Sequence, residues 1–318
     1  MKTGTLVISL DFELIWGVFD HVDINNKKEY FDNTLNVIPK IIENFVNNDV
    51  KATWATVGML FNDNWEEWHY NIPVNKPTYA NIKLDPYAYG KANKNLGLDR
   101  FFFAPKIIND LQNAAGQEIG THTYSHYYCL EQGQTKEQFE ADLDLVVKLG
   151  NKFKIPLKSL VFPRNQFNQE YLESCVNRNI LTVRSNPNIW YWDTLKPQTI
   201  AHKIFRTGDS YLNLGAKSYQ KNSINLNLPS SQPASRFLRP QSKSQLLNSL
   251  RLIRIKEEII NAARKGEVYH LWWHPHNFAI DPQGAIKALQ SILEVYNHCK
   301  STYGMESKTM LEIHNDLL

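Results

Sequence analysis

Two carboxylates near the N-terminus have the spacing of a paired site. Asp11 and Glu13 end the apolar run that begins at Leu6. If this run is a β-strand, residues two apart face the same side, so both carboxylates face one site while Phe12 packs away from it. Carboxylates this close repel each other unless a cation lies between them or one keeps its proton. They are either a metal ligand and a base, or solvated charges at a strand end.

Two histidines four residues apart form a second group. Residues 120–126 read Gly-Thr-His-Thr-Tyr-Ser-His. At this spacing His122 and His126 would lie on one face of a helical turn, from which both imidazoles could bind one metal ion. With one carboxylate they supply three ligands and leave a position open for water, as catalytic sites do. The spacing alone is weak evidence, and the acidic strand end strengthens it.

A third group lies close to the C-terminus. His274 follows an apolar run and has bulky aromatic neighbours. A histidine in this place could protonate a leaving amine, or it could be a buried side chain that a backbone group satisfies. His270 and His276 are weaker candidates for the same chemistry.

These groups must be positioned by an α/β architecture, because short apolar runs alternate with longer segments of helical period. The predicted strands are Leu6–Leu10, Lys51–Val57, Glu118–Thr121, Ser159–Phe162, Ile180–Val183 and Val268–Trp273. The predicted helices are Leu35–Asn47, Pro105–Ala115, Lys136–Phe153, Ser242–Lys265 and Gly284–Tyr303. The carboxyl ends of barrel strands meet on one rim, where active sites are built. Five strands here end in ionisable or amide side chains: Asp11 and Glu13, His122 and His126, Arg164 and Asn165, Arg184 and Asn186, and His274 and His276.

The domain organisation is predicted to be simple. Residues 1–318 are expected to form a single catalytic domain with insertions near 62–100 and 208–240, both of which lack sustained periodicity. Aromatic faces in the first insertion could hold sugar rings, or they could form the core of a lid. These aromatic residues are Trp65, Trp68, Tyr70, Tyr79, Tyr87 and Tyr89.

Composition excludes some partners. The formal net charge is only +3, which does not indicate a nucleic-acid partner. The three cysteines are an odd number without a close pair, which is typical of a reducing compartment. No apolar run has the length of a signal-peptide core or of a membrane span of about 20 residues. We therefore expect a cytoplasmic protein without a membrane span.

The motifs together resemble the polysaccharide deacetylase family, the carbohydrate esterases with a NodB homology domain. The matching segments lie within residues 6–277, the span of the resemblance. They are Ser-Leu-Asp-Phe-Glu (9–13), Lys-Ala-Thr-Trp (51–54), Gly-Thr-His-Thr-Tyr-Ser-His (120–126), Val-Phe-Pro-Arg (161–164) and Trp-Trp-His (272–274). The resemblance implies an α/β fold, a distorted (β/α)7 barrel of the NodB type, with an Asp–His–His metal triad, an Asp base and a His acid.

The family's first motif has two adjacent aspartates, the base followed by the metal ligand. In this chain one residue separates the two carboxylates, as in a divergent Asp-x-Glu branch. The resemblance therefore implies that Asp11 is the base and that Glu13 binds the metal with His122 and His126. It also implies that His274 is the acid, and that the cofactor is one divalent ion, with Zn²⁺ expected.

The third motif departs from the family pattern, because Pro163 precedes Arg164 where the usual order is Arg-x-Pro. By the resemblance Arg164 would hold Asp11 ionised, and a backbone contact to the oxyanion would come from around Asn165. We assign substrate contacts to Asn165, Trp273 and His276.

The predicted function is metal-dependent hydrolysis of a sugar N-acyl amide, with N-acetyl expected, in a cytoplasmic glycan or nucleotide-sugar precursor. The partner is then an acylated sugar or glycan. One alternative is an allantoinase-like hydrolase of a small cyclic amide, which the aromatic first insertion disfavours. The other is a sugar-binding protein that has lost catalysis, which the complete set of acid, ligands and base disfavours.

Overall fold

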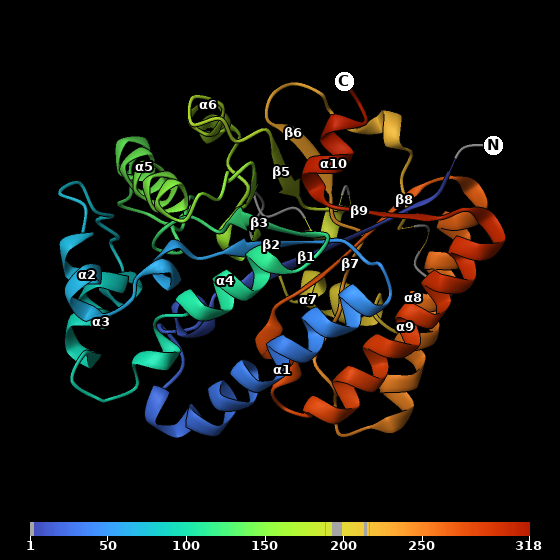
Figure 1. The fold of residues 1–318 in the computed structure, drawn as a ribbon, viewed down its shortest axis with the longest axis horizontal. Helices are drawn as coiled ribbons and strands as arrows, with labels where there is room; N and C mark the ends of the chain where they lie inside the picture. Colours follow the sequence, from blue (N-terminus) through green and yellow to red (C-terminus); the bar gives the residue numbers. More distant parts are fainter. Residues whose placement is uncertain (1–2, 188, 193–198, 213–214, 216) are drawn as a thin grey trace.

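The computed structural model describes residues 3–187, 189–192, 199–212, 215 and 217–318. Its centre is a curled parallel sheet surrounded by helices (Figure 1). The strands are β1 (Thr5–Phe12), β2 (Ala52–Thr56), β3 (Gln117–Thr121), β4 (Ser159–Val161), β5 (Thr182–Ser185), β6 (Ser230–Pro233), β7 (Arg236–Phe237), β8 (Val268–Trp273) and β9 (Glu306–Lys308). Their order is β6-β5-β4-β3-β2-β1-β8-β7, with β9 beside β1.

The two ends of the sheet are joined by one short segment. β6 pairs with β5, and β7, which begins after Ala234 and Ser235, pairs with β8. The backbone N–H of Ala234 donates to Ser185 (2.9 Å), and that of Ser235 donates to His270 (2.8 Å). The chain thus passes from β5 to β8, which curls the sheet. The expected parallel α/β fold with a curled sheet is confirmed, and the count of seven strands stays a prediction.

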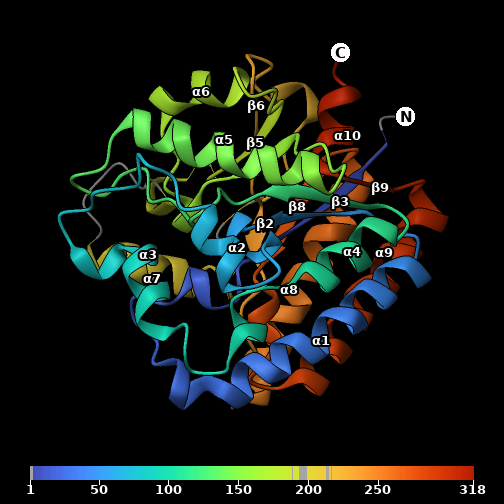
Figure 2. The same cartoon turned by 60° about the vertical axis from the view of Figure 1, so that its left-hand side comes forward.

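Helices cover the outer face of the sheet (Figure 2). They are α1 (Lys28–Asn47), α2 (Trp65–Tyr70), α3 (Pro86–Asn93), α4 (Pro105–Asn113), α5 (Lys136–Lys152), α6 (Leu172–Val176), α7 (Ile200–Gly208), α8 (Gln245–Lys265), α9 (Pro282–Tyr303) and α10 (Met310–Asn315). α8 and α9 lie side by side, and each ends at a glycine in the left-handed conformation, Gly266 and Gly304, which has no Cβ to oppose it. In the described parts of the chain, no helix is both long and apolar enough to cross a membrane.

Alternation along β1 separates two environments. Leu6, Ile8, Leu10 and Phe12 join the main core between sheet and helices. The intervening residues face inward, where Val7 packs in a small apolar cluster. The other members of that cluster are Ala55, Val161, Ile224, Val268, Met310 and Ile313. Since α10 supplies Met310 and Ile313, it closes the amino-terminal end of the curled sheet, and the polar residues gather at the carboxyl end.

The two predicted insertions differ. The first contains α2 and α3, and most of its aromatic side chains are core: Trp68 stacks on Trp16 and Tyr87 is fully buried, whereas Tyr70 is 81% exposed. The second is not only loop, because it supplies β6 and β7. Residues 213–214 and 216 of this segment lie outside the described residues. β6 was missed because it is polar: the Nε2 of its buried Gln232 donates hydrogen bonds to Thr182 and to the Met310 carbonyl.

Candidate active site

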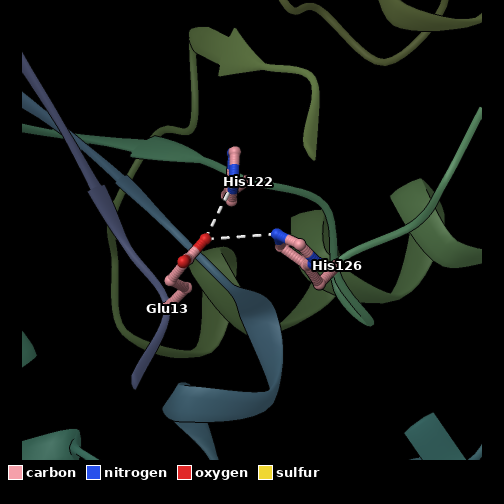
Figure 3. Close-up of side chains that lie close together, drawn as sticks. All are labelled: Glu13, His122 and His126. Atoms are coloured by element: carbon pink, nitrogen blue, oxygen red, sulfur yellow. Dashed lines mark ion pairs between the residues drawn. The ribbon is translucent and has the colours of Figure 1, made fainter. Parts of the chain in front are cut away.

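Glu13, His122 and His126 come together at the carboxyl ends of β1 and β3 (Figure 3). Glu13 Oε2 lies 3.5 Å from His122 Nε2 and 3.1 Å from His126 Nε2, and all three side chains are buried. Ligands about 2.0–2.2 Å from a tetrahedral zinc ion lie about 3.4 Å from one another. The spacing therefore fits one such ion.

The ring of His122 is oriented by its other nitrogen. Nδ1 donates a hydrogen bond to the carbonyl of Val161 (2.8 Å), which places the lone pair on Nε2. Nε2 is buried and makes no hydrogen bond to any residue that the structure describes. Burial lowers the pKa of His126 to about 4, although Glu13 acts in the opposite direction. The free Nε2 of His122 and the neutral ring of His126 are thus suited to bind a cation.

The loop that carries the two histidines is not helical, so the expected helical turn is wrong. Thr123 and His126 have positive φ values of 63° and 56°. The backbone N–H groups of Tyr124 and Ser125 donate to the carboxylate of Asp142 on α5, at 2.6 and 3.0 Å, instead of to a preceding helical turn. Burial raises the pKa of Asp142 to about 7, and these hydrogen bonds act against that rise. Asp142 therefore fixes a strained loop that aims both imidazoles at Glu13.

Glu13 is positioned by the short 3₁₀ helix Leu14–Gly17 that follows it. A Cβ added to Gly17 would lie 1.9 Å from Glu13 Cδ, so any other residue would force this carboxylate to move. Burial raises the pKa of Glu13, but His274, His122 and His126 outweigh it and hold the pKa well below its usual range. Glu13 is therefore ionised.

Asp11 is held by Arg184, a buried residue of β5. Arg184 Nη1 and Nη2 each donate to one Asp11 oxygen at 2.7 Å, and Nη1 also donates to Ser9 at 3.0 Å. The guanidinium lies 4.2 Å from the ring centre of Trp272. Burial raises the pKa of Asp11, but Arg184, His122 and His274 together lower it. Asp11 is thus ionised.

Arg164 does not make the expected contact. It lies beyond β4 with a positive φ of 54°, donates to Asp20 Oδ2 at 2.6 Å, and stacks over the Tyr128 ring. The prediction that Arg164 holds Asp11 is corrected: Arg184 occupies that place. The reason is strand phase, because Arg184 and Asp11 both face inward from their strands, whereas Arg164 lies in a loop.

His274 is partly exposed at the site, and the buried His276 lies against it. His274 Nε2 is 3.7 Å from Asp11 Oδ2 and 3.7 Å from Glu13 Oε1, and its side chain is 23% exposed. The His276 ring stacks on that of His274, with centroids 4.8 Å apart and planes within 7°. His276 Nδ1 is 3.7 Å from Glu13 Oε1.

The two other predicted substrate contacts are placed differently. Asn165 Oδ1 accepts a hydrogen bond from Arg184 (3.0 Å), and the Asn165 backbone N–H donates to Phe162, so this N–H is engaged within its own turn. Trp273 is fully buried and stacks on Phe278, away from the site. Trp272 faces the site instead, because alternate residues of β8 face inward.

Because Arg184 and not Arg164 pairs with Asp11, we expect substitutions of the two arginines to differ in their effect on stability. We expect Arg184→Gln to lower the free energy of unfolding by about 3–5 kcal/mol, because it leaves the buried Asp11 charge without its partner. Arg164→Gln should cost about 1 kcal/mol or less, because its pair with Asp20 is partly exposed. Urea unfolding of both variants measures this, and equal losses would contradict the assignment.

Comparison with known proteins shows which solved structures have a similar fold. No family model and no curated protein matches the sequence. A protein from Mycobacterium smegmatis described as a polysaccharide deacetylase aligns over 99% of this chain and 91% of its own, with TM-score 0.61 and 11% identity. One from Pseudomonas aeruginosa PAO1 with the same description covers 98% and 89%, with TM-score 0.58 and 9% identity.

A third structure is an enzyme of another description. The GH57-type branching enzyme of Pyrococcus horikoshii aligns over 100% of this chain and 71% of its own, with TM-score 0.56 and 11% identity. At such identities the likeness concerns the fold. The GH57-type branching enzyme also has a similar fold. The chain therefore has the fold of proteins described as polysaccharide deacetylases.

Proposed function

We propose that this chain is a metal-dependent hydrolase that removes an acyl group from the nitrogen of a sugar. The observation that carries the proposal is the buried Glu13–His122–His126 cluster next to the ionised Asp11 and the partly exposed His274. A ligand set, a proton acceptor and a proton donor at one strand edge are the parts that amide hydrolysis needs. The fold shared with proteins described as polysaccharide deacetylases supports a carbohydrate substrate.

Glu13, His122 and His126 would hold one divalent ion, with zinc expected from two imidazoles and one carboxylate. When bound, such an ion polarises the amide carbonyl and makes a water more acidic. Asp11 accepts the proton of the attacking water, and Arg184 keeps Asp11 ionised and oriented. His274 donates a proton to the departing nitrogen, and His276 holds its ring by stacking.

Two further features belong to the proposal. Residues 1–318 act as one catalytic domain of the divergent Asp-x-Glu type, because β6 and β7 of the second segment belong to the same sheet as β1 and β8. A cytoplasmic location rests on Cys129, Cys175 and Cys299, which are buried and free, as suits a reducing compartment.

The proposal is tested by metal content and acyl release. We expect about one divalent ion per purified chain by elemental analysis, and release of acetate or formate from N-acylated sugars or nucleotide sugars. His122→Ala should lose both. Gly17→Ala should also lose metal, because its Cβ displaces Glu13, while Gly208→Ala is the control, since its Cβ would meet no described atom within 4 Å.

Several outcomes would contradict this. Equal, substoichiometric metal content in the wild type and in His122→Ala would contradict the assigned metal site. Hydrolysis of cyclic amides but of no N-acylated sugar would favour the allantoinase-like alternative. Tight sugar binding without any acyl release from a metal-loaded chain would favour a binding protein.

A further inference from the structure

A cavity of about 550 Å³ lies beside the candidate active site. It is bounded by the N-terminal parts of α8 and α9, which run next to each other (Figures 1 and 2), and by the segment that follows β7. Its volume is in the range of small-molecule sites, roughly 300–1,000 Å³. The polar residues on which the argument depends are Arg239, Gln245, Asn248, Arg251 and Lys287.

Two arginines in this cavity have no anionic partner. Arg251 is only 8% exposed, donates to the Pro240 carbonyl and to Asn248, and its buried Nε has no hydrogen-bond partner among the described residues. Arg239 donates to Ser210 Oγ and to a backbone carbonyl. Within the described part of the chain, no carboxylate lies within ion-pair distance of either guanidinium. Burial lowers the pKa of both groups, which is the cost of cations without a counter-ion.

Arg236, on the wall of the same cavity, shows the contrast. Its Nε and Nη2 donate to the Glu258 carboxylate at 2.7 and 2.6 Å, so its charge is neutralised within the protein. In this wall of the cavity, Arg236 therefore has an internal carboxylate partner, Glu258. Arg239 and Arg251 are left with neutral oxygens only.

The remaining charges of the cavity add to the positive side. Lys287 of α9 is exposed at the cavity. Asp281 is the acidic residue of the lining, and its Oδ1 accepts from the Gly284 N–H (2.9 Å) as the N-cap of α9. The N-terminal ends of α8 and α9 contribute partial positive charge. Asp209 also acts on Arg239, but it pairs with Lys217 and Arg236. Apart from the Arg236–Glu258 pair, the lining holds three cations and one capped carboxylate, so its excess charge is positive, as suits an anion.

The cavity borders the proposed catalytic groups through one side chain. Phe237 lines the cavity, and its ring centre is 4.5 Å from that of Trp272 and 5.8 Å from that of His274. A ligand on the cavity side of Phe237 is separated from the proposed acid by this one ring, so it lies farther from His274 than the 5.8 Å between the two ring centres. The cavity and the active site can hold two ends of one molecule.

We propose that this cavity binds the phosphate or diphosphate group of a phosphorylated N-acyl sugar, the substrate of the neighbouring site. Guanidinium groups suit phosphate because their N–H groups match its oxygens in pairs. The identity of the sugar part rests on the proposed function, whereas the anion site rests on the cavity alone.

The test uses inorganic pyrophosphate as the probe and the metal-loaded protein, by calorimetry. We expect a dissociation constant below about 1 mM, and a loss of at least about tenfold in Arg239→Gln, Arg251→Gln and Lys287→Gln. Lys106→Gln, an exposed cation of α4, is the matched control and should bind as the wild type does. His122→Ala should also bind normally, which excludes binding through the metal ion.

A second measurement identifies the source of the phosphate. For an N-acyl sugar carrying phosphate, Lys287→Gln should raise KM about tenfold with little change in kcat, while KM for the unphosphorylated N-acyl sugar stays the same. No pyrophosphate binding, or binding equal in the four lysine and arginine variants, overturns the anion site. Binding without the KM effect overturns the substrate part. If no sugar is hydrolysed, the proposed function fails. The calorimetry then still shows whether the cavity binds an anion.

Discussion

Replacing Asp11 by asparagine is expected to abolish acyl release while the metal ion stays bound. Asparagine fills the same space, but its amide cannot accept the proton of the attacking water, and general-base catalysis is worth about 10²–10⁴-fold. Glu13→Gln should instead release the metal, because a neutral amide is a poor ligand between the two imidazoles of His122 and His126. Elemental analysis and acyl release, measured on the same preparations, give both results.

The control for this pair is Asp20→Asn. Asp20 is also a partly buried carboxylate with an arginine partner, Arg164, but this pair lies outside the Glu13 cluster. Its loss should leave metal content and turnover near wild type. Because Asp11→Asn also weakens the Arg184 contact, its unfolding must be measured in parallel. Loss of metal from the Asp11 variant with retention in the Glu13 variant would mean that the two roles are reversed.

The location of the candidate site followed from the sequence, because parallel strands deliver their carboxyl ends to one rim. Asp11, Glu13, His122, His126 and His274 indeed meet there. The types of these residues and the spacing of two between Asp11 and Glu13 are visible in the sequence. The catalytic roles given to them stay predictions.

The choice between neighbouring candidates was harder, because strand phase decides it. Arg164 and Arg184 both follow apolar runs, but only Arg184 lies within its strand and faces inward. The same applies to Trp272 and Trp273. Counting back from His274 in steps of two selects Trp272, and this was the signal that could have found it.

Contacts from distant segments could not be read from the sequence. The histidine loop takes its shape from Asp142, whose carboxylate binds the loop backbone from α5. The pairing of Arg184 with Asp11 joins residues 173 positions apart. β6 was not predicted because it is polar, and its buried Gln232 donates hydrogen bonds to residues of β5 and α10. Such contacts depend on the assembled fold rather than on local pattern.

His274→Ala is expected to reduce hydrolysis of an N-acyl sugar by about 10²–10⁴-fold, and hydrolysis of an activated aryl ester much less. The difference comes from the leaving group. An amine anion is too basic to depart, so the nitrogen must be protonated as the C–N bond breaks, whereas a phenoxide departs with little help. Among the proposed catalytic side chains, that of His274 is 23% exposed while Asp11 and Glu13 are nearly buried, so His274 can meet a leaving group that projects toward solvent.

Two control variants separate proton donation from structural effects. His298→Ala removes an exposed imidazole near the C-terminal end of α9. It should change neither the rate of amide hydrolysis nor that of ester hydrolysis. His276→Ala removes the ring stacked on His274, so it should reduce amide hydrolysis partially while sparing the ester. Because His274 lies only 3.7 Å from Glu13, metal content must be measured in each variant. Equal losses on amide and ester, or a loss of metal that accounts for both, would assign His274 to support of the metal site and not to protonation of the leaving nitrogen.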